Sequence, residues 1–202
     1  FFTRCKIMTR EFTPSEGKVL LETARQSIAH VLRGAELPPL NLEELPAALV
    51  APGASFVTLT IAGQLRGCVG SIEANQALVQ DVRDRAIGAA FGDPRFPSLT
   101  PSEYEDLEIE ISTLTRPEAL SYHNPQDLVR KLRPGIDGVI LKDQFRRATF
   151  LPQVWEKLPD PELFLSRLCL KMGLESDAWQ HRNLEVEIYQ VQKFTEGEFT
   201  GG

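Results

Sequence analysis

Long apolar runs, an excess of basic residues and paired cysteines are all missing from this sequence of 202 residues. A membrane-spanning helix needs about 20 consecutive apolar residues, and no run approaches that length. The formal net charge of −6 would repel a phosphate backbone, which argues against nucleic-acid binding. The composition therefore predicts a soluble globular chain of one domain, or two tightly joined subdomains, that binds neither membrane nor nucleic acid.

Cysteine is scarce, and the three cysteines are not spaced as metal ligands or as a disulfide framework. Cys5, Cys68 and Cys169 form no CxxC pair and have no histidine at metal-ligand spacing. This argues against a zinc framework or a disulfide scaffold, so we expect no metal, no cofactor and a reducing cytoplasm. Because a methionine follows the apolar opening at Met8, the native chain is expected to begin there, and Cys5 within residues 1–7 is set aside.

The first half predicts a helix followed by a hairpin and a second helix. Thr13 as N-cap, Pro14 and Glu16 form a capping box for a helix that ends at Gly34. Residues 35–54 are expected to form a covering loop with at most one short turn. The remaining expected elements are a hairpin of strands 55–61 and 65–72 and a helix that Asn75 caps and Gly92 ends.

The second half echoes this order, which suggests an internal duplication. The expected elements are strand 107–114, a hairpin of 138–143 and 147–152 around Gln144 and Phe145, helix 161–173 capped by Asp160, and one long strand 184–194. Strands connected by short hairpins, with helices after them, predict an α+β fold. The expected boundaries are an extension at 1–12, a domain at 13–194 and a tail at 195–202.

The stretch "LRGCVG", residues 65–70, is the strongest candidate for a site. Gly67 and Gly70 would let a ligand or another segment approach the strand closely. Arg66 lies on the same strand face as Cys68 and would favour a reactive thiolate. The alternative is structural, with Cys68 as a small buried apolar residue and the two glycines relieving crowding.

A second candidate lies in the loop "DPRF". Asp93 and Arg95 lie in a loop with prolines at positions 94 and 97, which would aim their side chains at a cleft. The alternative is a turn capped by Asp93 and a salt bridge from Arg95 that ties the subdomains together. His30, His123 and His181 lie in no motif, so each is expected at the surface or in a cap. "GIDG" is expected to form a tight turn at Asp137.

Five segments together resemble a known family. "LRGCVGSIEA", "AAFGDPRFPSLTPSEYEDLEIEISTLT", "GIDGVILKD", "ATFLPQVWEKLPD" and "LCLKMGL" follow one another across residues 65–174. In order and spacing they resemble the AMMECR domain family, whose bacterial and archaeal branch is the AmmeMemoRadiSam system protein A. The resemblance implies an α+β domain of two subdomains around a cleft walled by the LRGC motif. It also implies an association with a radical S-adenosylmethionine (radical SAM) protein and a Memo-like protein. Several family members carry histidine where this chain has Asp137, which puts a shared Cys-His pair in doubt.

Two classes of function follow from these residues. The first is a cleft built around Arg66, Cys68, Asp93 and Arg95 that binds a small molecule or a protein side chain, with Cys68 as candidate nucleophile. Whether it is an enzyme stays open. The second is a non-catalytic interaction module that docks a partner through the same cleft or the acidic stretch 102–110. The basic stretch 130–147 is interpreted as a solvated face.

Overall fold

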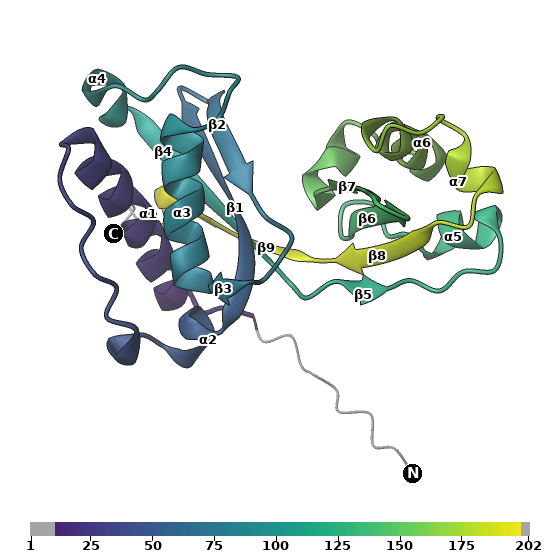
Figure 1. Cartoon of the computed structure of the whole chain (residues 1–202), viewed down its shortest axis with the longest axis horizontal. Coiled ribbons are helices and arrows are strands. Elements are labelled where there is room, and N and C mark those ends of the chain that lie inside the picture. The colour runs from purple at the N-terminus through teal and green to yellow at the C-terminus, as the bar shows by residue number, and fades with distance from the viewer. Residues whose placement is uncertain (1–10, 199–202) are drawn as a thin grey trace, which may run out of the picture. The chain divides into compact units, whose positions relative to one another are not determined.

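The computed structural model describes residues 11–198, which form two compact units (Figure 1). Unit 1 holds residues 11–114 and 192–198, and unit 2 holds residues 115–191. Cys5, Met8 and the expected chain start lie outside the described residues. Helices packed with two antiparallel sheets confirm the α+β class, while the predicted domain boundaries and duplication stay predictions. Within residues 11–198, no helix is long and apolar enough to cross a membrane.

The first helix, α1 (Pro14–Leu32), begins as its capping box predicts. Thr13 donates its backbone N–H to the Glu16 carboxylate at 2.8 Å, and the Glu16 N–H donates to the Thr13 hydroxyl at 3.3 Å. The chain leaves the helix through Gly34, whose φ of +63° lies in the left-handed region that suits glycine. Both ends are therefore set by local residues.

A five-stranded sheet forms the centre of unit 1. Its order is β2-β1-β4-β9, and β3 pairs with the start of β1. The strands are β1 (Pro52–Ile61), β2 (Gln64–Gly70), β3 (Gln76–Ala77), β4 (Leu107–Leu114) and β9 (Val191–Thr195). The turn between β1 and β2 uses positive φ at Ala62 and Gly63, as a tight hairpin requires.

Two sequence predictions in this unit are wrong. Residues 35–54 hold more than a loop with one short turn, because they contain the short helices η1 (Leu42–Glu44) and α2 (Ala47–Val50) and the start of β1. Asn75 does not cap the second helix, α3 (Leu78–Phe91), whose N-cap is Ala77 with no side-chain hydrogen bond. Residues 76–77 pair with β1 first, so the chain stays extended past Asn75.

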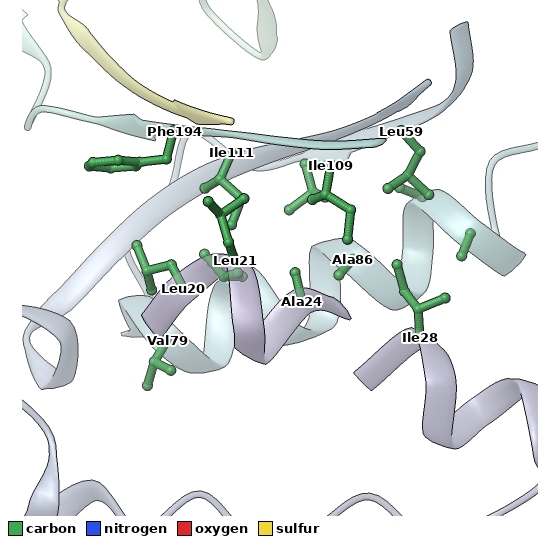
Figure 2. Packing of buried hydrophobic residues seen from close by; sticks show 14 of the residues in the cluster. Leu20, Leu21, Ala24, Ile28, Leu59, Val79, Ala86, Ile109, Ile111 and Phe194 are labelled. Carbon is green, nitrogen blue, oxygen red and sulfur yellow. The ribbon is translucent and has the colours of Figure 1, made fainter. Parts of the chain in front are cut away.

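Helices α1 and α3 cover one face of the sheet, and the core lies between the two helices and the sheet (Figure 2). Side chains from α1, α3 and three strands meet in this layer, including Leu20, Leu21, Ala24, Ile28, Leu59, Val79, Ala86, Ile109, Ile111 and Phe194. Burial of these apolar side chains is the main stabilising term of the unit. Alternate residues of each strand point to the other face, which carries polar side chains.

Unit 2 has a four-stranded sheet of order β5-β8-β6-β7. Its elements are β5 (Glu118–Ala119), α5 (Pro125–Lys131), β6 (Gly138–Asp143), β7 (Arg146–Phe150), η2 (Pro152–Glu156), α6 (Pro161–Lys171), α7 (Ala178–His181) and β8 (Glu185–Tyr189). The hairpin at Gln144 and the Asp160 cap of α6 are confirmed. Cys169 is fully buried in this unit's core.

The single long strand expected at 184–194 is wrong. The chain divides at Gln190 into β8, which pairs with β6 and β5, and β9, which belongs to the sheet of unit 1. At the division, Gln190 and Thr115 exchange hydrogen bonds of 2.9 and 2.8 Å. Alternating residues report only that a segment is extended, so they carry no sign of a change of sheet.

Candidate functional site

The LRGCVG stretch contains a β-bulge. Leu59 pairs with Gly67 and Thr60 pairs with Leu65, which leaves Arg66 as the extra residue of β2. At Gly67, a Cβ atom would stand 2.1 Å from the carbonyl oxygen of Ala89 on α3. The helix backbone therefore lies directly against the strand, and Gly67 has a packing reason that does not involve a ligand.

Gly70 has a similar reason on the opposite face of the strand. A Cβ atom there would lie 2.2 Å from the ring of Phe56, which pairs with it across the hairpin. Both glycines thus permit close approach, as their pattern predicts, and the atoms that approach belong to this chain. Their predicted contribution to a ligand site stays a prediction.

Arg66 is held by the segment that follows α3. Its Nε and Nη2 donate to the two carboxylate oxygens of Glu103 at 2.8 and 3.1 Å, and Nη2 also donates to the Pro97 carbonyl at 2.9 Å. The guanidinium lies 5.9 Å from the centre of the Phe96 ring. With only 8% of the residue exposed, Arg66 serves mainly to fix this segment against β2.

Glu103 is equally constrained. Hydrogen bonds from Arg66 and from the Thr100 N–H lower the pKa of its carboxyl to about 2. Thr100 and Glu103 form the same capping pattern as Thr13 and Glu16, at the start of α4 (Pro101–Tyr104). One atom of the arrangement is unsatisfied, because Nη1 of Arg66 is buried without a hydrogen-bond partner among residues 11–198.

Asp93 and Arg95 cap the outer edge of β2 at Cys68. The Cys68 N–H donates to the Asp93 carboxylate at 2.9 Å, and Arg95 Nη2 reaches the Cys68 carbonyl at 3.4 Å. Arg95 also donates through Nε and Nη2 to both Asp93 oxygens, at 3.0 and 2.6 Å. These hydrogen bonds from Arg95, with that from Cys68, hold the pKa of Asp93 well below its usual range. Side chains therefore occupy the backbone groups of Cys68 that this edge strand would otherwise present to another strand.

The structure thus brings four predicted residues together: Arg66, Cys68, Asp93 and Arg95 all lie around β2 in unit 1. The Arg95 ion pair joins two residues of the same unit, so the expectation that it ties the subdomains together is not met.

The thiol of Cys68 lies on the face of the sheet away from α3. It is half-buried, and the Thr58 hydroxyl donates to its sulfur at 3.4 Å. Thr58 pairs with Cys68 on one side and with Glu110 of β4 on the other, so the three side chains form a row across the sheet. Thr58 is a contact that sequence reasoning missed, although its place in the alternating strand put it on the polar face.

A hollow of about 330 Å³ adjoins this row. Thr58, Thr60, Glu108 and Glu110 line its floor on β1 and β4, and Thr195, Glu196 and Gly197 close it. Thr60 donates to Glu108 at 3.4 Å, and Lys193 pairs with Glu110 at 3.4 Å. Glu196 also pairs with Arg25, so Glu108 is the lining carboxylate that forms no ion pair within residues 11–198, and its charge favours a positively charged group.

Comparison with known proteins identifies the family of this chain. The AMMECR1 family profile matches residues 21–194. The chain belongs to the AMMECR1 family. A protein of Methanothermobacter thermautotrophicus is 38% identical over 182 residues, covering 90% of this chain and 94% of the relative. Protein MK0488 of Methanopyrus kandleri is 37% identical and covers 96% of this chain and 95% of its own.

A solved structure agrees with these relatives. The crystal structure of the uncharacterized protein PH0010 from Pyrococcus horikoshii superposes with a TM-score of 0.82 at 32% identity. The match covers 91% of this chain and 93% of the other. The AMMECR-like fold and the family resemblance are therefore confirmed.

No histidine supports Cys68 as a nucleophile in this AMMECR1-family chain, within the part the structure describes. His30 is the only histidine of unit 1, and its Nδ1 lies 2.8 Å from the Gln26 carbonyl within α1. At the position where the family pattern suggested histidine, Asp137 is fully buried in unit 2. Its carboxylate accepts hydrogen bonds from the Arg133 backbone N–H, Nε and Nη2. Asp137 thus closes the predicted turn.

The basic stretch of unit 2 is largely neutralised. Its cations pair with nearby carboxylates: Arg130 and Lys131 with Asp127, Arg133 with Asp137, and Lys142 with Glu187. This supports the interpretation of a solvated face. Glu175, Asp177 and His181 bring three exposed ligand atoms within 4.8 Å of one another, and the expectation of no bound metal stays a prediction.

Proposed function

We propose that unit 1 binds a small molecule or a protein side chain at the Cys68 thiol and the adjoining 330 Å³ hollow. The observation that carries this is the position of Thr58, which both donates to the Cys68 sulfur and lines the hollow. A ligand in the hollow would therefore contact Thr58, the residue that also holds the thiol. Hollows of about 300–1,000 Å³ are of the size that small ligands use.

Glu108, whose carboxylate forms no ion pair within residues 11–198, selects the charge of the ligand. A protonated amine or a guanidinium would be attracted, while a phosphate or a carboxylate would be repelled. Arg66, Asp93 and Arg95 are positioning residues in this proposal. They hold the backbone of β2 and the following loop, so that the thiol is presented by a rigid strand.

In this proposal the site binds its ligand without a chemical reaction, and Cys68 contributes a contact. A nucleophilic role would need a nearby base, and the carboxylate of Asp93 is committed to Arg95 and to the Cys68 N–H. The partners proposed for the site are those that the family resemblance implies, a radical SAM protein and a Memo-like protein, in the cytoplasm.

Alkylation of Cys68 tests the proposal. The probe is N-acetyl-lysine methylamide, with its Nε-acetylated form as the uncharged control, and peptide mapping after brief iodoacetamide treatment gives the modified fraction of each cysteine. We expect the charged probe to slow alkylation of Cys68 severalfold and the acetylated probe to have no effect. Buried Cys169, whose pKa burial raises, should stay unmodified in every sample.

A matched pair of variants completes the test. Thr58→Val should abolish protection by the probe, whereas Thr23→Val, which changes a partly buried threonine of α1, should keep it. Equal protection by both probes, or protection that survives Thr58→Val, would refute binding at this hollow. Capture of the radical SAM protein and of the Memo-like protein is then compared between wild type and Cys68→Ser, after confirming that the two forms of the chain have the same melting temperature.

A further inference from the structure

A larger hollow of about 490 Å³ lies beside the first on unit 1. It is bounded by α1, by residues 105–108 at the start of β4 and by residues 196–197. The two hollows share Glu108, Glu196 and Gly197. They therefore adjoin at these residues, one hollow beside α1 and the other on the polar face of the sheet, and we name the two together the α1–β4 groove.

The floor of the larger hollow is apolar and rigid. Leu21 and Leu107 line it, and each is only 3% exposed because it belongs to the core beneath. A floor made of core side chains changes little when a ligand arrives, so binding pays little to order it. It offers a small apolar surface to an apolar group.

The cation at the base of the groove is already used. Arg25 donates to both carboxylate oxygens of Glu196 and to the carbonyls of Tyr104 and Leu107. Glu196 accepts a further hydrogen bond from the Ile109 N–H at 3.0 Å. Arg25 thus fastens residue 196 to the start of β4, and its charge is balanced within the protein.

The rim is left with an excess of negative charge. Lys18 pairs with Glu22 at 3.9 Å. Glu105 and Glu108 are exposed, and neither forms an ion pair within residues 11–198. The groove therefore combines an apolar floor with carboxylates along its rim.

We propose that the α1–β4 groove docks an extended segment of a protein partner that carries one apolar and at least two basic side chains. The apolar side chain lies on Leu21 and Leu107, and the basic ones lie against Glu105 and Glu108. Side chains of an extended chain point to one side at every second residue, about 6.6 Å apart, so two of them can enter adjoining hollows. A single small cation would use only one hollow. This inference rests on the proposed function, because the segment would end at the hollow beside Cys68.

Fluorescence anisotropy tests the groove with a labelled heptapeptide of lysine, leucine and glycine. In the control peptide, glutamate replaces lysine. Glu105→Lys and Glu108→Lys should each weaken binding of the lysine peptide by about fivefold or more. Glu43→Lys makes the same charge change at an exposed residue of η1, away from the groove, and should alter affinity less than about twofold. Higher salt should weaken binding.

Three results would overturn the proposal. They are equal weakening by all three variants, equal binding of the glutamate peptide, and spermine binding as tightly as the peptide with the same response to Glu105→Lys. The last would identify the occupant as a small polyamine. Two measurements on the same protein separate the two proposals: alkylation of Cys68 with the lysine probe, and binding of the peptide. If the probe does not slow alkylation while the peptide still binds, the Cys68 site is refuted. If the probe slows alkylation while the peptide does not bind, the groove is refuted.

Discussion

Replacing Glu103 by glutamine should destabilise unit 1 through Arg66. The change keeps the size of the side chain and removes the charge that faces a guanidinium of which only 8% is exposed. Breaking a fully buried ion pair costs about 3–5 kcal/mol. The Glu103 side chain is 32% exposed, so water replaces part of the lost interaction, and we expect Glu103→Gln to lower the free energy of unfolding by about 2 kcal/mol.

The pH dependence of this loss has a definite sign. Hydrogen bonds from Arg66 and the Thr100 N–H lower the pKa of Glu103 from 4.5 to about 2 in the folded state. A group whose pKa falls on folding stabilises the protein above its unfolded pKa, and that contribution disappears as pH falls through the folded pKa. A shift of this size corresponds to about 3 kcal/mol before solvent screening, consistent with the smaller figure after it. The difference between wild type and Glu103→Gln should therefore be constant at neutral pH and shrink between pH 4.5 and about 2.

Urea denaturation at several pH values measures the effect. Trp155 and Trp179 both lie in unit 2, so tryptophan fluorescence monitors that unit, and circular dichroism is needed to include unit 1. Glu105→Gln is the matched control, because this exposed glutamate lies two residues on and has no ion pair within residues 11–198. A Glu103→Gln protein as stable as the Glu105→Gln control at pH 7, or a difference that persists unchanged near pH 2, would refute a structural role for the Arg66 pair.

Two further stability predictions follow from the packing of unit 1. Gly67→Ala should lower the free energy of unfolding by at least about 2 kcal/mol, because its new Cβ would meet the Ala89 carbonyl oxygen at 2.1 Å. Gly197→Ala, whose Cβ would meet nothing within 4 Å, serves as the control in thermal denaturation. Similar melting temperatures for both would contradict the close approach of α3 to β2. Thr13→Ala should lower the free energy of unfolding by about 1 kcal/mol through loss of a cap, and Leu59→Ala by about 2–5 kcal/mol through a cavity in the core. If thermal denaturation showed Thr13→Ala to be the more destabilising of the two, the packing of β1 would be contradicted.

The sequence by itself determined the local structure of this protein. The sequence predicts the capping box of α1, the Asp160 cap of α6 and the two hairpins, one between residues 55–61 and 65–72 and one around Gln144, and the structure confirms them. Each of these signals lies within a few residues of the structure it directs, so spacing along the chain is sufficient to read it. The same holds for the alternating strands around Leu59 and Ile109, whose apolar side chains face the core. Asn75 failed as a cap because its neighbours pair with a strand more than 20 residues away along the chain.

The candidate site was decided by the tertiary structure. The sequence predicts that the LRGC and DPRF motifs lie together, and the structure brings them into contact, yet their roles depend on contacts that no local pattern specifies. The bulge at Arg66 sets which face carries the thiol, since a shift of one residue reverses the direction of every side chain in a strand. Glu103 and Thr58 were missed because they reach Arg66 and Cys68 only after the sheet and the loop after α3 have packed. The division of the last strand at Gln190 has the same origin, because the partner of an extended segment is chosen by the packing of distant residues.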